Sequence, residues 1–250
     1  MIFPIGDDQV KGGSKPIFSY AFIAINILVF VLLQLGNDVF TYSNSAVPYE
    51  ITMGSDLIGE YNQIPHYEGP SPIYLTLLYS IFMHGGWLHL IGNMLFLWVF
   101  ADNIESTIGN TRFVIFYLLG GLVASLSHIA TDTSSVVHSL GASGAIAACI
   151  GAYLVMFPKS KVKVLVFIKI ISVPAFVFGL FWVGQQVLGV TGSQGNTAWW
   201  AHIGGLIFGV FAGLFFRHRY PKIEQAYPEY APVKRKATRY NNRYITNRIK

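Results

Sequence analysis

The sequence predicts an all-α membrane protein with six transmembrane helices and a long outer loop after the first of them. Of its 250 residues, 53% are hydrophobic and only 12% are charged, whereas a soluble domain carries about a quarter of charged residues. The apolar runs are each close to the ~20 residues that a helix needs to cross a bilayer. This composition excludes a soluble globular domain with one large core.

The predicted spans cover residues 17–35, 88–104, 112–130, 142–157, 164–188 and 199–216. The first apolar run is longer than that of a signal peptide and no cleavage site follows it, so we expect a retained span. The first loop is polar over residues 37–72. Residues 73–83 are apolar but too short to cross, and we expect them to lie at the interface against the bundle. Lys169 falls inside the fifth run, near its inner end, where its long side chain can reach the interface.

The distribution of basic residues predicts the orientation. The loops at 36–87, 131–141 and 189–198 contain no Lys or Arg, whereas the other loops and both terminal segments do. By the positive-inside rule, both termini are cytoplasmic, which indicates the cell membrane, with an organelle membrane as the alternative. The chain then divides into a cytoplasmic N-terminus, a six-helix membrane domain and a basic, flexible cytoplasmic tail: residues 1–16, 17–216 and 217–250.

The net charge of +5 does not predict nucleic-acid binding. Much of the excess lies in the tail, next to a span, where basic residues determine topology and can touch anionic lipid. No nucleic-acid-binding motif accompanies it. The single cysteine, Cys149, lies within an apolar run, so no intrachain disulfide can form and the residue is interpreted as small core filling.

Four polar residues lie near the outer ends of three spans. His89 and Asn93 are in the second span, Ser143 begins the fourth, and His202 is near the start of the sixth. At ~1.5 Å per residue, all four lie within one or two turns of the outer face. Each alone has a plain interpretation as a packing or hydrogen-bonding residue. Ionisable groups in a membrane are costly, however, so their grouping at one depth predicts a functional site reached by water.

Two rows of small residues predict how this site assembles. Spans four and six carry them at every fourth position: Gly144, Ala148 and Ala152 on one, Gly205, Gly209 and Gly213 on the other. Such rows let two helix backbones approach closely, which would bring Ser143 towards His202. Histidine is the base that most often activates a serine. An acidic third member normally orients that base, but none lies at this depth, so we predict a Ser143–His202 dyad.

The second span supplies candidate stabilisers for the oxyanion of acyl transfer. His89 and Asn93 are four residues apart and share a helical face, and the first N–H groups of span four are free because a helix begins there. His84 with His89 is a weak metal signature, since no carboxylate or cysteine lies at that depth. His128 and His138 flank the third outer turn, and we expect no catalytic role for them.

These residues belong to three motifs whose order and spacing resemble the rhomboid family of intramembrane serine proteases. The matching segments are 84–98 (HGGWLHLIGNMLFLW), 141–144 (GASG) and 201–205 (AHIGG), and Glu105 matches the acidic residue at the end of the family's second span. The resemblance covers about residues 17–216. It implies a six-transmembrane-helix, rhomboid-like bundle.

The resemblance also implies roles for individual residues. Ser143 would be the nucleophile and His202 the general base, His89 and Asn93 would help to form the oxyanion hole, and His84 would be a structural loop residue. Substrates would be transmembrane proteins in the lipid bilayer, cut in or near a span whose helix unwinds easily. Access would be lateral, past span five and the loop before span six. No metal or organic cofactor is expected.

Two departures from the family pattern leave a second function open. Leu75-Thr76 stand where some members carry a Trp-Arg pair, so the first loop is expected to be held differently. Ala147 stands where some members stack a Tyr on the histidine, and we expect another aromatic to replace it. The alternative is a non-catalytic protein of the same fold that binds membrane clients, although this chain keeps both Ser143 and His202. A small transporter is a weaker hypothesis, since polar residues do not cross the midplane and no repeat is evident.

Overall fold

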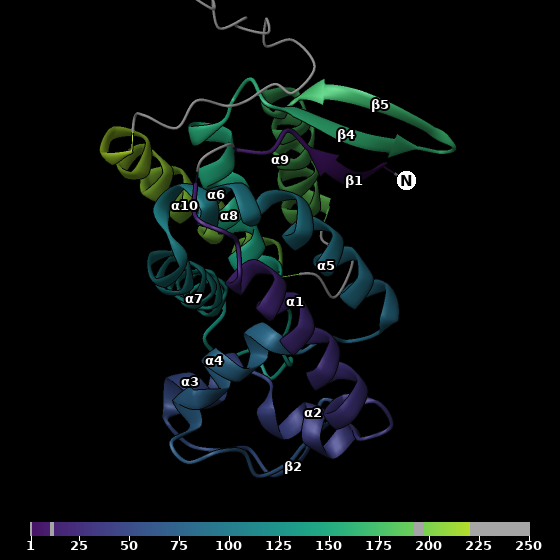
Figure 1. Ribbon diagram of the computed structural model, residues 1–250. Helices are drawn as coiled ribbons and strands as arrows, with labels where there is room; N and C mark the ends of the chain where they lie inside the picture. Colours follow the sequence, from purple (N-terminus) through teal and green to yellow (C-terminus); the bar gives the residue numbers. More distant parts are fainter. Residues whose placement is uncertain (1, 11–12, 193–197, 221–250) are drawn as a thin grey trace, which may run out of the picture.

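The computed structural model describes residues 2–10, 13–192 and 198–220, which form a bundle of helices with a small sheet at one end (Figure 1). The helices are α1 (Phe18–Val29), α2 (Asp38–Asn44), α3 (Pro48–Met53), α4 (Thr76–Tyr79), α5 (Trp87–Phe100), α6 (Asp102–Ile108), α7 (Asn110–Ile129), α8 (Ser143–Met156), α9 (Ala175–Gly192) and α10 (Trp199–Arg219). A π-helical turn, η1 (Phe30–Gln34), extends α1, and the 3-10 segments η2 (Ile73–Leu75) and η3 (Ser80–Phe82) flank α4. The strands are β1 (Ile2–Asp7), β2 (Gly59–Tyr61), β3 (Ile64–His66), β4 (Lys161–Val166) and β5 (Lys169–Pro174).

The structure is mostly helical, which agrees with the predicted membrane fold, but its strands mean that it is not all-α. Within its described part, three helical stretches are long and apolar enough to cross a membrane: Trp87–Ile108, Asn110–Ile129 and Trp199–Arg219. Shorter apolar helices accompany them at Phe18–Gln34, Ile73–Phe82, Ser143–Met156 and Ala175–Val190. Every predicted span except the fifth therefore coincides with an apolar helix, to within a few residues. The last helix runs three residues past the predicted boundary at 216, and the rest of the predicted tail, 221–250, lies outside the described residues.

The predicted start of the fifth span is wrong. Residues 164–174 belong to the hairpin of β4 and β5, and α9 begins only at Ala175. Val162 and Val164 are buried while the lysines beside them are exposed, which is the alternation of a half-buried strand rather than of a helix. Lys169, predicted to reach the interface from within a helix, is an exposed residue of β5.

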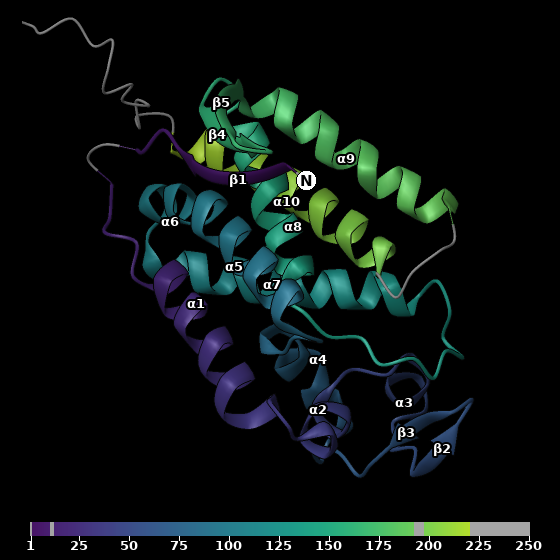
Figure 2. The ribbon, with the colours of Figure 1, turned by 90° about the vertical axis from the view of Figure 1, so that its right-hand side faces the viewer.

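The N-terminal segment, predicted only as a cytoplasmic terminus, contains a strand that completes a sheet. β1 pairs antiparallel with β4, and β4 with β5. Asn103 of α6 holds the segment, because its side chain accepts from the Val10 N–H (2.7 Å) and donates to the Asp7 carboxyl (2.6 Å). Burial and the neighbouring Asp102 raise the pKa of Asp7 to about 8. In two views this sheet lies at the opposite end of the bundle from α2, α3 and β2 (Figure 2).

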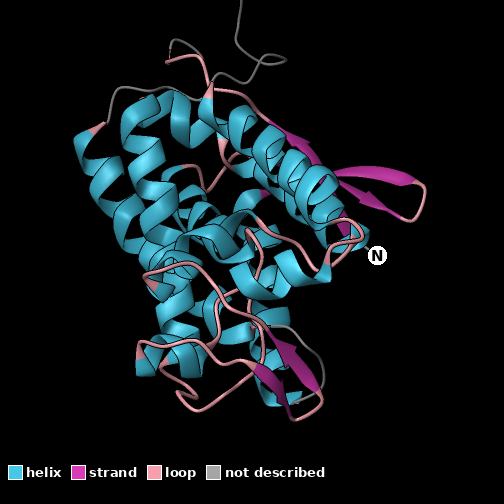
Figure 3. Cartoon of the chain, turned by 90° about the horizontal axis from the view of Figure 1, so that it is seen from below, coloured by secondary structure: helices cyan, strands magenta, loops and turns pink. Residues whose placement is uncertain are grey.

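The first outer loop is folded around two short helices and the β2–β3 hairpin, a second group of strands far from the sheet (Figure 3). Ala46 of this loop and Ser139 exchange backbone hydrogen bonds of 3.0 and 2.8 Å. Gln34, at the end of η1, holds both the N–H and the C=O of His84 with its side-chain amide, at 2.9 and 3.1 Å. The loop is thus bonded to the segment that precedes α8, and the end of η1 is bonded to the segment that precedes α5.

Candidate active site

The predicted contact between α8 and α10 is present, and the two backbones touch. A Cβ on Gly209 would overlap the carbonyl oxygen of Ala148, and one on Gly213 would lie 2.8 Å from the Cα of Ala152. No side chain larger than hydrogen fits at these positions without moving a backbone. The rows of small residues therefore set the distance between the first turns of the two helices.

That close packing brings the predicted nucleophile and base together. Ser143 is the first residue of α8, and His202 lies in the first turn of α10. The Oγ of Ser143 and the Nε2 of His202 are 2.8 Å apart, which is hydrogen-bond distance. A base at this distance can accept the proton of the hydroxyl directly.

A second polar contact at His202 was not predicted. The Nδ1 of His202 is 2.7 Å from the Oε1 of Gln186, a residue of α9 that is only 4% exposed. Only a carboxylate was sought in the sequence as the group that orients His202, and the amide of Gln186 was not considered. The available signal was the polar pair Gln185-Gln186 in an otherwise apolar run, at the outer depth where His202 lies.

Aromatic rings flank the imidazole, as expected from the small residue at position 147. The ring centroids of Trp182 and Trp199 lie 6.1 and 6.0 Å from that of His202. The indole of Trp199 meets it edge-on, at an interplanar angle of 88°. Two tryptophans, from α9 and α10, thus lie beside the imidazole on which some family members stack a tyrosine from the position of Ala147.

His89 faces the same site across a glycine. A Cβ on Gly141 would lie 2.9 Å from the Nε2 of His89 and 3.7 Å from the Oγ of Ser143, so both atoms lie within 4 Å of one point. Gly141 has a φ of +135°, which favours glycine as well. The N–H of Gly85 donates to the Nδ1 of His89 (3.3 Å). In the neutral ring the proton is then on Nε2, so a donor faces the nucleophile.

Asn93 lies one turn further along α5 with an unused donor. Its Nδ2 is buried and has no hydrogen-bond partner within the part of the chain that the structure describes. His89, Asn93, Ser143, Gln186 and His202 all line one cavity of about 960 Å³. This volume is at the upper end of the range for ligand pockets. The four predicted site residues are therefore together, with donors at hand for an oxyanion.

No metal centre accompanies these groups in the described residues. Nowhere among residues 2–10, 13–192 and 198–220 do three or more His, Cys, Asp or Glu side chains meet in a metal-binding arrangement. His84 is 1% exposed, and burial lowers the pKa of its ring to about 3. Its position between the amide of Gln34 and the ring of His89, 5.1 Å away between centroids, fits the structural role that the motif implies.

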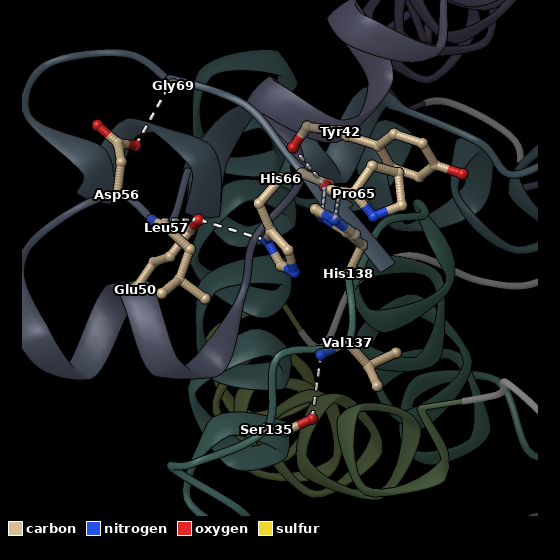
Figure 4. Close-up of polar contacts among 11 residues, drawn as sticks. Tyr42, Glu50, Asp56, Leu57, Pro65, His66, Gly69, Ser135, Val137 and His138 are labelled. Atoms are coloured by element: carbon tan, nitrogen blue, oxygen red, sulfur yellow. Dashed lines mark hydrogen bonds and ion pairs between the residues drawn. The ribbon is translucent and has the colours of Figure 1, made fainter. Parts of the chain in front are cut away.

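His138 lines the cavity and belongs to a cluster of polar contacts with the first loop (Figure 4). The Nδ1 of His138 lies 2.6 Å from the Oγ of Ser45, and its Nε2 lies 2.9 Å from the carbonyl oxygen of Pro65. The ring of His66 stacks on it with centroids 4.5 Å apart. Burial lowers the pKa of His138 to about 4. These contacts fasten the first loop to the segment that ends at Gly141.

Glu50 closes the far side of this cluster. Its Oε1 accepts from the Leu57 N–H (3.0 Å) and lies 3.7 Å from the Nδ1 of His66. Burial raises the pKa of Glu50 to about 7 and lowers that of His66. Both shifts favour the neutral forms, and 3.7 Å is too long for a hydrogen bond, so the contact is not a strong ion pair.

Comparison with known proteins agrees with the motifs. The Rhomboid domain matches residues 73–219. The chain is 33% identical over 198 residues to Rhomboid protease GluP of Bacillus subtilis, and the aligned region covers 79% of this chain and 34% of that protein. It is 32% identical over 157 residues to Presenilin-associated rhomboid-like protein A, mitochondrial, of Danio rerio, covering 60% and 41%. Rhomboid protein 1, mitochondrial, of Saccharomyces cerevisiae is 30% identical over 157 residues, covering 60% and 44%. The chain thus spans less than half the length of each of these relatives.

Proposed function

The chain belongs to the rhomboid family, and we propose that it is an intramembrane serine endopeptidase that cleaves membrane proteins in or near a transmembrane segment. The observation that carries this proposal is the 2.8 Å contact between Ser143 and His202, made by two helices at the edge of a large cavity. The similarity to a bacterial protein that is named a rhomboid protease supports it.

The proposed mechanism assigns one step to each group. The Oγ of Ser143 attacks the carbonyl carbon of the scissile peptide, and its proton passes to the Nε2 of His202. The carbonyl oxygen becomes an oxyanion that accepts hydrogen bonds from His89, Asn93 and the first N–H groups of α8. The C–N bond then breaks as His202 returns the proton to the leaving amine. Water attacks the acyl-enzyme with His202 again as base, which releases the second product and restores Ser143.

The proposal includes a topology of six spans with both termini in the cytoplasm. It rests on the absence of Lys and Arg from the outer loops and on the position of the sheet at the other end of the bundle. The cell membrane is the proposed location. Leu180 and Leu188 of α9 are each 71% exposed, so the outward face of α9 suits lipid or a substrate helix beside it. Lateral entry past α9 would lead to the cavity.

Labelling of the purified protein by a fluorophosphonate, together with cleavage of a reconstituted transmembrane substrate, tests the proposal. We expect labelling and cleavage by the wild type, and loss of both in Ser143→Ala and in His202→Ala. Ser139→Ala is the matched control, since this serine lines the same cavity and should leave labelling intact. Undiminished cleavage by Ser143→Ala would refute the mechanism. A folded wild type that binds membrane proteins but neither labels nor cleaves would favour the non-catalytic, client-binding alternative.

A further inference from the structure

Gln186 is a buried amide on α9 with a partner at each end. Its Nε2 donates to the backbone carbonyl oxygen of Trp182 (3.0 Å), and its Oε1 lies 2.7 Å from the Nδ1 of His202. A backbone carbonyl oxygen can only accept a hydrogen bond. The NH₂ group must therefore face Trp182, and the amide oxygen must face His202.

The direction of this amide determines which nitrogen of His202 carries the proton. The amide oxygen has no hydrogen to give, so the Nδ1 of His202 must be the donor. A neutral imidazole carries one ring proton, so Nε2 is then unprotonated. That lone pair faces the Oγ of Ser143 at 2.8 Å. A chain of hydrogen bonds thus begins at the Trp182 carbonyl and ends at the predicted nucleophile.

We propose that Gln186 is a positioning residue of the protease: it holds His202 in the tautomer whose Nε2 can take the proton of Ser143. The proposal rests on the proteolytic function proposed above. Gln186 does not touch the reacting atoms, and it acts through the ring of His202. Once Nε2 is protonated, the Nδ1–H still donates to the amide oxygen, and the hydrogen bond becomes charge-assisted. The amide thus also supports the transient imidazolium.

An amide suits this position better than a carboxylate does. A carboxylate at His202 would place a net charge within an apolar bundle, where an ionised group is costly. It would also point an oxygen at the Trp182 carbonyl oxygen, which offers no proton. The amide satisfies both neighbours and adds no charge.

The position of Gln186 also links the base to α9. Ser143 and His202 lie on α8 and α10, whose backbones touch, whereas Gln186 comes from a helix with a widely exposed outer face. A shift of α9 away from α10 would leave the Ser143–His202 pair in place and remove the acceptor at Nδ1. The site would then hold its base in the active tautomer only while α9 is docked.

Enzyme kinetics on Gln186→Leu test this role against Gln185→Leu. Leu is close to Gln in size, and the Gln185 side chain, one position away, is exposed. We expect kcat to fall about 10- to 100-fold in Gln186→Leu with KM unchanged, which is less than the ~10⁴-fold loss seen where a wrong tautomer is imposed. The same unfolding midpoint in both variants will exclude a folding defect. Gln186→Glu, whose protonated carboxyl can make both contacts, should stay within about 10-fold of wild type.

Nitrogen NMR of the wild type, with ¹⁵N-labelled histidine, tests the tautomer without any turnover. We expect His202, assigned from the spectrum of His202→Ala, to carry its proton on Nδ1, and we expect Gln186→Leu to populate both tautomers. A wild-type His202 protonated on Nε2, or an unchanged kcat in Gln186→Leu, overturns the positioning role alone. A wild type that neither labels nor cleaves overturns the protease function, and this role with it.

Discussion

Glu105 accepts four hydrogen bonds from the start of α1, and the effect of replacing it by Gln can be estimated from these contacts. One carboxylate oxygen accepts from the N–H groups of Ile17 and Phe18, at 2.9 and 2.8 Å, and the other accepts from the N–H and the Oγ of Ser19, both at 2.7 Å. These N–H groups begin a helix and have no partner within it. The negative charge also lies at the positive end of the α1 dipole.

The expected loss follows from what an amide can still do there. The Gln oxygen can keep the two bonds to Ile17 and Phe18, and its NH₂ can donate to the Oγ of Ser19, but the N–H of Ser19 is left without an acceptor. A buried unsatisfied donor costs about 1–3 kcal/mol, and the lost interaction with the helix dipole costs up to about 1 kcal/mol more. We therefore expect Glu105→Gln to lower the free energy of unfolding by about 1–4 kcal/mol.

Reversible unfolding in a mild detergent titrated with SDS measures this difference. Glu60→Gln is the control, because Glu60 is exposed in the first loop. Ser19→Ala should cost less than Glu105→Gln, and the double variant should be less destabilised than the sum, since both changes act on one set of bonds. A Glu105→Gln protein within about 0.5 kcal/mol of wild type would show that the four contacts do not stabilise α1 as argued.

Three further changes test other parts of the molecule. Asn93→Ala removes one oxyanion donor of several, so kcat should fall by up to about 100-fold, or about 3 kcal/mol, with little change in KM; a full kcat in steady-state cleavage would exclude the donor role. Gly209→Ala places a methyl against the α8 backbone and should destabilise the bundle by about 1–3 kcal/mol, whereas Gly184→Ala, with open space around its Cβ, should not; equal unfolding midpoints would contradict this. The third change is Glu50→Gln. Folding raises the pKa of Glu50 from 4.5 to about 7, so its protonation adds stability as the pH falls over that window. Folding lowers the pKa of His138 from 6.5 to about 4, so it removes stability as the pH falls below 6.5. The substituted Gln side chain cannot take up the proton of Glu50, whereas the His138 effect is the same in both proteins. Glu50→Gln should therefore lose stability relative to wild type between pH 7 and pH 5, by about 1 kcal/mol. Parallel pH profiles of the two proteins would refute a raised pKa of Glu50.

The sequence allowed the core of the site to be predicted because each signal was local. Ser143 and His202 stand beside rows of small residues, and a row of this kind both identifies a helix face and fixes how near its neighbour can come. His89 and Asn93 share a face by their spacing alone. The one contact between distant segments that was used, that of α8 with α10, could be predicted because both helices carry the same kind of row.

The features that were missed depend on long-range partners. The hairpin at β4 and β5 is an apolar run beside an apolar helix, and hydropathy alone does not separate the two. β4 pairs with β5 and also with β1, where Ile2 lies opposite Val166, and the pairing with β1 joins segments that are far apart in the sequence. Gln186 was missed for a similar reason, since nothing in its own helix shows that it meets His202. An amide can be assigned this role only when both of its partners are known.

The placement of charge in the bundle accounts for an amide, rather than a carboxylate, beside His202. Glu105 is fully buried, yet four donors from the start of α1 surround its carboxylate. Beside His202, the contacts of the Gln186 side chain are with one donor, the Nδ1–H proposed above, and with one acceptor, the Trp182 carbonyl oxygen. One donor does not compensate a buried negative charge, whereas a neutral amide needs one donor and one acceptor and finds both. The described partners of each side chain therefore account for a carboxylate at the start of α1 and an amide beside His202.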